Sequence, residues 1–87
     1  MNQFCKDVIE YLQSEYNDGY QFELIAHQGI NGLRDTELRI KMGPQFTKII
    51  EKTSMNYIHI LYHKQKFNKE RNQYTWQKEL IDMIEGS

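Results

Sequence analysis

The chain has 87 residues and a mass of 10.5 kDa, which suits a single domain over residues 1–87. Eleven basic and twelve acidic side chains give a net charge of −1, which excludes a protein that binds nucleic acid through its overall charge and an acidic mimic of nucleic acid. The single cysteine excludes a disulfide framework and a cysteine-based zinc site, and no apolar run approaches the ~20 residues of a membrane span.

The N-terminal segment is predicted to form a helix over residues 3–17. Its apolar side chains recur at helical spacing, at Phe4, Val8, Leu12 and Tyr16. Gly19 follows a polar pair and suits the left-handed backbone that ends many helices. The acidic side chains of the segment fall mostly outside the apolar stripe, so we expect one face of this helix to pack on a core.

Two strands are predicted next, over residues 20–27 and 36–42, because apolar and polar side chains alternate in both. An Asn-Gly pair between them indicates a hairpin. A simple two-residue turn at that pair would place Ile25 opposite Leu38, although these side chains belong to different faces of the two strands. We therefore predict a connection of odd length, or a bulge at Gly29, that restores the match between the faces.

Three further elements complete the predicted order. Pro44 favours the start of a helix, and the apolar spacing predicts this helix over residues 44–53. Alternating bulky side chains then predict a third strand over 55–63, with bulk on both faces as in a central strand. A C-terminal helix is predicted over 75–85. Residues 66–74 are predicted to form either a loop or an extension of that helix.

The predicted fold class is α+β, with the element order α-β-β-α-β-α. An antiparallel three-stranded sheet with the helices mainly on one face is the simplest arrangement for these elements. A domain of this size has a thin core and a marginal stability. Docking to a partner would therefore stabilise it.

Charge is distributed unevenly along the chain. Residues 1–33 carry one basic and five acidic side chains, whereas residues 34–71 carry nine basic and four acidic ones. We expect a contact surface that combines the third strand, the basic loop 63–71, nearby aromatic rings and two cations of the second strand. The predicted binding residues are Arg39, Lys41, Tyr57, His59, His63, Lys64, Lys66, Lys69, Arg71 and Tyr74.

Two interpretations of this surface stay open. The outward face of the predicted sheet resembles, in chemical type only, the RNA-reading sheet of an RNA-recognition motif. In the basic segment 63–71, basic side chains would neutralise phosphates and nearby aromatic rings would stack on unpaired bases. The alternative is a solvated connection whose aromatic side chains anchor the last helix. Trp76 is accordingly either an anchor for a partner or a side chain of the core.

No metal, cofactor or catalytic group is predicted. His59 and His63 are four residues apart on the predicted strand, so roughly 13 Å would separate them at ~3.3 Å per residue. His27, on a neighbouring strand, is then the remaining partner for an ion shared with His59. Cys5 lies in the first turn of the first helix, where the helix dipole would lower its thiol pKa. Because no base is identified beside Cys5, we interpret it as an apolar side chain.

The small size, the α+β layout and the abundance of Asn, Lys, Ile, Tyr and Phe resemble the small accessory proteins of bacteriophages and mobile elements, including anti-CRISPR inhibitors. The resemblance implies a non-catalytic protein that inhibits a host nucleic-acid-targeting defence complex through protein–protein contact. The alternative is a small DNA- or RNA-binding domain that uses the basic segment 63–71. The acidic first helix and the basic middle of a second copy would also suit a homodimer. No signal peptide is seen, so we expect a cytoplasmic protein.

Overall fold

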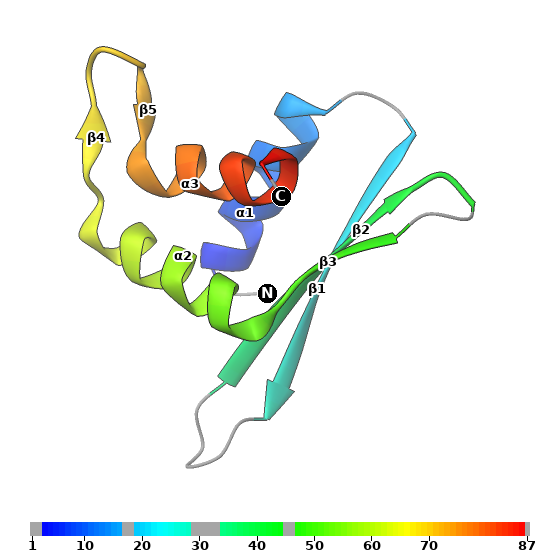
Figure 1. The fold of residues 1–87 in the computed structure, drawn as a ribbon. Coiled ribbons are helices and arrows are strands. Elements are labelled where there is room, and N and C mark those ends of the chain that lie inside the picture. Colours follow the sequence, from blue (N-terminus) through cyan, green and yellow to red (C-terminus); the bar gives the residue numbers. More distant parts are fainter. Residues whose placement is uncertain (1–2, 17–18, 29–33, 45–46, 87) are drawn as a thin grey trace.

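The computed structural model places three helices on one side of a three-stranded antiparallel sheet, with a second sheet of two short strands (Figure 1). The structure describes residues 3–16, 19–28, 34–44 and 47–86. Their element order is α-β-β-β-α-β-β-α. The predicted α+β class is confirmed, and so is the predicted antiparallel three-stranded sheet with helices on one face.

The register of the main sheet brings apolar side chains onto one face. Its strands, in spatial order, are β1 (Tyr20–Gln28), β2 (Arg34–Met42) and β3 (Thr47–Ile50). Leu24 of β1 pairs with Leu38 of β2, so direct partners share a face. Five residues, 29–33, connect the paired ends of β1 and β2. The predicted odd-length connection is confirmed, whereas the predicted bulge at Gly29 lies outside the described residues.

The segment after β2 differs from the prediction. A helix over 44–53 and a strand over 55–63 were expected, but β3 comes first and the helix α2 (Lys52–Lys64) follows it. β3 is short and rich in β-branched residues, and it pairs with β2. The thirteen residues of α2 bury Met55 and Ile58, which are three apart, as a helix does and a strand does not. Alternating bulk in this segment was therefore a misleading signal.

A β-hairpin lies within residues 66–74, for which the sequence allowed either a loop or an extension of the last helix. It is followed directly by the last helix, and the three elements are β4 (Phe67–Asn68), β5 (Gln73–Tyr74) and α3 (Thr75–Glu85). Gln65 ends α2 with a left-handed backbone (φ 48°), and its N–H donates to the Tyr62 carbonyl at 3.2 Å. Asn72 is also left-handed (φ 53°), which turns the hairpin back toward α3. The predicted helix over 75–85 is confirmed.

The hydrophobic core lies between the inner face of the main sheet and the three helices. The first of these, α1 (Gln3–Glu15), contributes the apolar stripe expected from its sequence. The buried side chains are Phe4, Val8, Leu12, Leu38, Ile40, Ile50, Met55, Ile58, Trp76, Leu80 and Ile84. Within the described part of the chain, no helix has the length and apolarity needed to cross a bilayer.

Candidate functional site

The outer side of α2 carries large apolar side chains. Tyr57 and Ile60 are 47% and 56% exposed, and Lys64 lies one turn after Ile60 on the same side. This side is opposite to the one that buries Met55 and Ile58 in the core. The exposed stripe is therefore not needed to hold the helix in place.

The β4–β5 hairpin continues from the C-terminal end of α2 and projects beyond the helices (Figure 1). Phe67 and Tyr74 form a cross-strand pair whose ring centroids are 5.0 Å apart at an interplanar angle of 89°. Both rings stay exposed, at 45% and 39%. In the turn, the Arg71 backbone N–H donates to Oδ1 of Asn68 at 3.2 Å. The hairpin thus presents two aromatic rings on a short ordered support.

Exposed basic side chains lie in and next to the hairpin. We call the combined area the α2–hairpin surface and define it by eight residues: Tyr57, Ile60, Lys64, Lys66, Phe67, Lys69, Arg71 and Tyr74. Six of them were predicted as binding residues. Ile60 and Phe67 were not among the predicted set, because the strand interpretation of 55–63 and the undetermined state of 66–74 hid their exposure.

Arg39 and Lys41 are not part of this surface. They lie on β2 and alternate with Leu38 and Ile40, whose side chains are buried under the helices. Arg39 and Lys41 therefore face the side of the main sheet that the helices leave uncovered. Nη2 of Arg39 also forms an ion pair with Oε1 of Glu37 at 3.0 Å. The predicted grouping of these two cations with the basic loop is not what the structure shows.

His59 and His63 lie next to each other on α2. Their Nε2 atoms are 2.9 Å apart and their ring centroids 4.5 Å apart. The separation of roughly 13 Å expected for a strand is wrong, because residues four apart on a helix are neighbours. His59 is also outside the sheet, so no strand pairing joins it to His27. Among the described residues, no group of three metal-ligating side chains converges on one point.

Acid is expected to destabilise the protein through His59. Burial beneath the Phe4 ring, and then the neighbouring His63, lower the pKa of His59 from its usual 6.5. The unfolded chain therefore takes up a proton at a higher pH than the folded one. The contribution of His59 to stability is complete above about pH 6.5 and is lost progressively as the pH falls below that value.

Urea unfolding of the wild-type protein and of His59→Gln, followed between about pH 7.5 and pH 5, tests this expectation. The stability of His59→Gln should fall less steeply with acid than that of the wild type. Identical pH profiles for His59→Gln and the wild type would refute the assignment.

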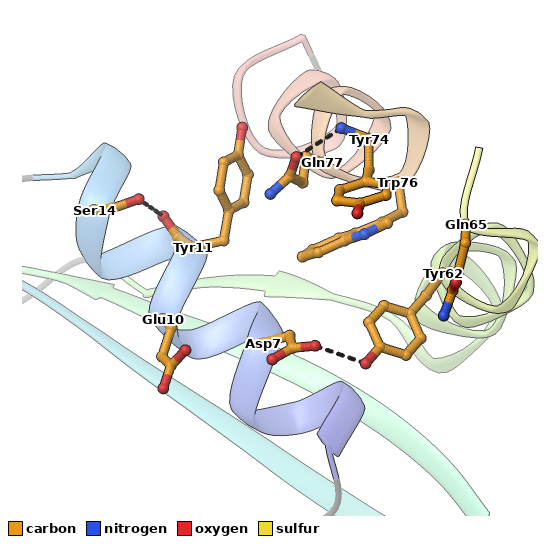
Figure 2. A pocket seen from close by; sticks show the side chains of 9 residues that line it. All are labelled: Asp7, Glu10, Tyr11, Ser14, Tyr62, Gln65, Tyr74, Trp76 and Gln77. Carbon is orange, nitrogen blue, oxygen red and sulfur yellow. Dashed lines mark hydrogen bonds between the residues drawn. The ribbon is translucent and has the colours of Figure 1, made fainter. Parts of the chain in front are cut away.

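A cleft of about 460 Å³ opens between α1, the C-terminal end of α2 and the start of α3 (Figure 2). This volume falls in the range of sites that hold small ligands or single side chains. The lining residues come from all three helices and from β5: Asp7, Glu10, Tyr11, Ser14, Tyr62, Gln65, Tyr74, Trp76 and Gln77.

Aromatic rings form the base of the cleft. Trp76 lies between Tyr11 and Tyr62, with ring centroids 5.6 Å away in both cases and interplanar angles of 71° and 70° (Figure 2). Trp76 is only 5% exposed, so it belongs to the core and also reaches the cleft. The structure therefore supports the interpretation of Trp76 as a core side chain, and its role as an anchor for a partner stays a prediction.

The α1 side of the cleft carries negative charge. The Tyr62 hydroxyl donates to Oδ2 of Asp7 at 2.6 Å, and the Gln3 amide donates to its Oδ1 at 2.7 Å. The hydrogen bond to Asp7, followed by burial, raises the pKa of Tyr62 to about 12. Glu10 is exposed, and its carboxylate has no hydrogen-bond or ion-pair partner among the described residues. The lining contains these two carboxylates and, within the described part of the chain, no basic side chain.

The sequence identified only Tyr74 and Trp76 of this cleft. One signal that could have revealed the rest lies in the first helix, where Asp7, Tyr11 and Ser14 are spaced three and four apart. They form a polar and aromatic flank beside the apolar stripe. A flank of that kind indicates a partly covered face, although it does not say what lies opposite.

The environment of Cys5 differs from that of an activated thiol. Cys5 is partly buried and packs against the core. Burial raises its thiol pKa, and the nearby N-terminus opposes this only in part. The direction of the shift is thus opposite to the lowered pKa predicted for the first turn of a helix, because burial is the largest cause.

Comparison of the chain with protein-family models, curated proteins and solved structures finds no match. Two features of the described residues therefore bear on function. One is the α2–hairpin surface, which is exposed, aromatic and basic. The other is the cleft, which is aromatic and acidic.

Proposed function

We propose that the protein is a non-catalytic binding protein whose α2–hairpin surface contacts a protein partner. The observation that supports this most is the exposure of four large apolar side chains on two consecutive elements, namely Tyr57, Ile60, Phe67 and Tyr74. Aromatic anchors dominate the binding energy of protein interfaces, and exposed apolar patches mark such interfaces. The surrounding lysines and Arg71 would steer an acidic partner onto the surface.

The partner we propose is a host nucleic-acid-targeting defence complex, which the protein would inhibit in the host cytoplasm as anti-CRISPR proteins do. A small protein can inhibit such a complex by occluding a site or by blocking its assembly. The composition and size of the chain support the proposal of an inhibitor. The basic and aromatic character of the α2–hairpin surface suits contact with an acidic surface of the partner.

The test starts with capture of the partner from the source cells on the tagged protein, followed by affinity measurements with the purified partner. Ile60→Ala and Tyr57→Ala are expected to weaken binding about tenfold, as truncation of interface anchors does. Ile49→Ala is the matched control, because Ile49 is similarly exposed (49%) but lies on β3, away from this surface. Equal losses for Ile60→Ala and Ile49→Ala would contradict the proposed surface.

Direct binding of nucleic acid is the second candidate, and the four cations of the α2–hairpin surface beside two exposed rings favour it. Affinity for a single-stranded oligonucleotide would then fall steeply with salt. Replacing Lys66, Lys69 and Arg71 together by Gln should reduce the slope of log affinity against log salt by about two. A slope unchanged by the triple substitution would exclude these cations as the nucleic-acid contacts.

A further inference from the structure

We propose that the cleft between α1, α2 and α3 binds an arginine side chain of the protein partner. The inference rests on the proposed function, because it assigns a chemical group of the partner to a second feature of the same contact region. Three properties of the cleft support it, namely its aromatic base, its charge and its position beside the α2–hairpin surface.

The aromatic base suits a delocalised cation. Trp76, Tyr11 and Tyr62 line one region of the cleft, and indole and phenol rings attract a cation through the negative charge of their faces. A guanidinium group is planar and weakly hydrated, so it stacks on such rings with a smaller loss of hydration than an ammonium group. The contacts between the three rings hold them in place before any ligand arrives.

The charge of the cleft selects a cation over a neutral group. Asp7 and Glu10 both line it, and none of the described lining side chains is basic. Asp7 already accepts two hydrogen bonds, but an ionised carboxylate has about four acceptor sites, so two remain. The carboxylate of Glu10 has no described partner and lies one turn further along α1. Together they offer acceptors for the several N–H donors of a guanidinium group.

The position of the cleft connects it to the partner. Tyr74 both lines the cleft and belongs to the α2–hairpin surface, and Gln65 lies between Lys64 and the hairpin. Tyr74 therefore joins the cleft to the hairpin part of the α2–hairpin surface, so a protein seated on the hairpin would lie next to the cleft. The cleft volume of about 460 Å³ leaves room for the aliphatic stem of an arginine as well as its guanidinium group.

The single tryptophan of the chain provides a direct measurement. Because Trp76 lines the cleft and is the only tryptophan, occupation of the cleft should change the fluorescence of the protein. Titration with the blocked peptide acetyl-Gly-Arg-Gly-amide should give a saturable change. The same peptide with citrulline, which has nearly the same shape without the charge, should give none. Equal responses to the two peptides, or no response to the arginine peptide, would overturn the proposal.

Variants on α1 locate the contact. Glu10→Gln is expected to weaken binding of the arginine peptide about threefold, since it removes one exposed charge. Glu15→Gln, on the same helix but outside the cleft, is the matched control and should change nothing. Equal effects of Glu10→Gln and Glu15→Gln would show general attraction by an acidic helix and would overturn the specific site.

The two proposals fail in distinguishable ways. Ile60→Ala should weaken partner binding and leave peptide binding unchanged, because Ile60 is not in the cleft. If the arginine peptide gives no response while the partner is still captured, the arginine site in the cleft is refuted and the α2–hairpin surface is not. Self-association that the arginine peptide reverses would assign the arginine to a second copy of this chain, and would overturn its assignment to a different protein.

Discussion

Ile58→Ala is expected to destabilise the protein by about 2–5 kcal/mol, whereas Ile60→Ala should change its stability by less than about 0.5 kcal/mol. Both residues lie on α2, two positions apart. Ile58 is 0% exposed and Ile60 is 56% exposed. Truncation of Ile58 removes buried methyl groups and leaves a cavity in a packed core, while truncation of Ile60 removes contacts mainly with water.

Urea unfolding measured by circular dichroism at 222 nm gives both values on the same scale, provided that the slopes of the transitions agree. The comparison also tests the secondary structure of residues 52–64. On a strand, Ile58 and Ile60 would point to the same face and would respond alike. Similar losses for the two variants would therefore contradict the helix. A loss of 2–5 kcal/mol is a large share of the roughly 5–15 kcal/mol that stabilises most domains.

The elements that the sequence predicted correctly are those with one dominant periodicity. Phe4, Val8 and Leu12 fit only a helix, and all three are buried on α1. The alternation around Leu38 and Ile40 fits only a strand, and matching the faces of β1 and β2 was enough to predict an odd connection between them. Local pattern decides the structure where it has a single interpretation.

Residues 44–64 carry two patterns, and the local sequence cannot choose between them. Ile58, Ile60 and Tyr62 recur at every second position as on a strand, while Met55 and Ile58 are spaced as on a helix. Pairing of β3 with β2 uses residues 47–50 for the sheet, which leaves the following segment to cover the core as α2. Because residues 52–64 form a helix and not a strand, His59 and His63 are in contact. The wrong secondary structure therefore also gave a wrong distance between these two side chains.

The cleft could not be predicted because its residues are distant in sequence. Asp7 and Tyr62 are 55 positions apart and meet only when α1 and α2 pack on the same face of the sheet. The basic segment was visible from composition alone, because its cations are close together along the chain. Surfaces formed by one continuous segment can be found from sequence, whereas a cavity between three helices requires their packing.

Tyr62→Phe is expected to destabilise the protein by about 1–2 kcal/mol, because it removes a hydrogen bond to a charged acceptor that joins α2 to α1. Tyr57→Phe is the matched control. It deletes the same hydroxyl from an exposed position of the same helix, and its stability should stay within about 0.3 kcal/mol of the wild type. Urea unfolding at neutral pH measures both changes. Equal effects of the two substitutions would show that the bond to Asp7 contributes nothing.

Alkaline pH provides a second measurement of the same bond. The pKa of Tyr62 is raised from 10 to about 12 in the folded protein, so the folded state keeps a proton that the unfolded chain loses. The contribution of Tyr62 to stability is therefore complete below pH 10 and disappears as the pH rises toward 12. Tyr62→Phe should lose less stability over this interval than the wild type, and absorbance at 295 nm should show one late-titrating tyrosine fewer. If Asp7→Asn leaves that late titration unchanged, Asp7 is not the cause of the raised pKa.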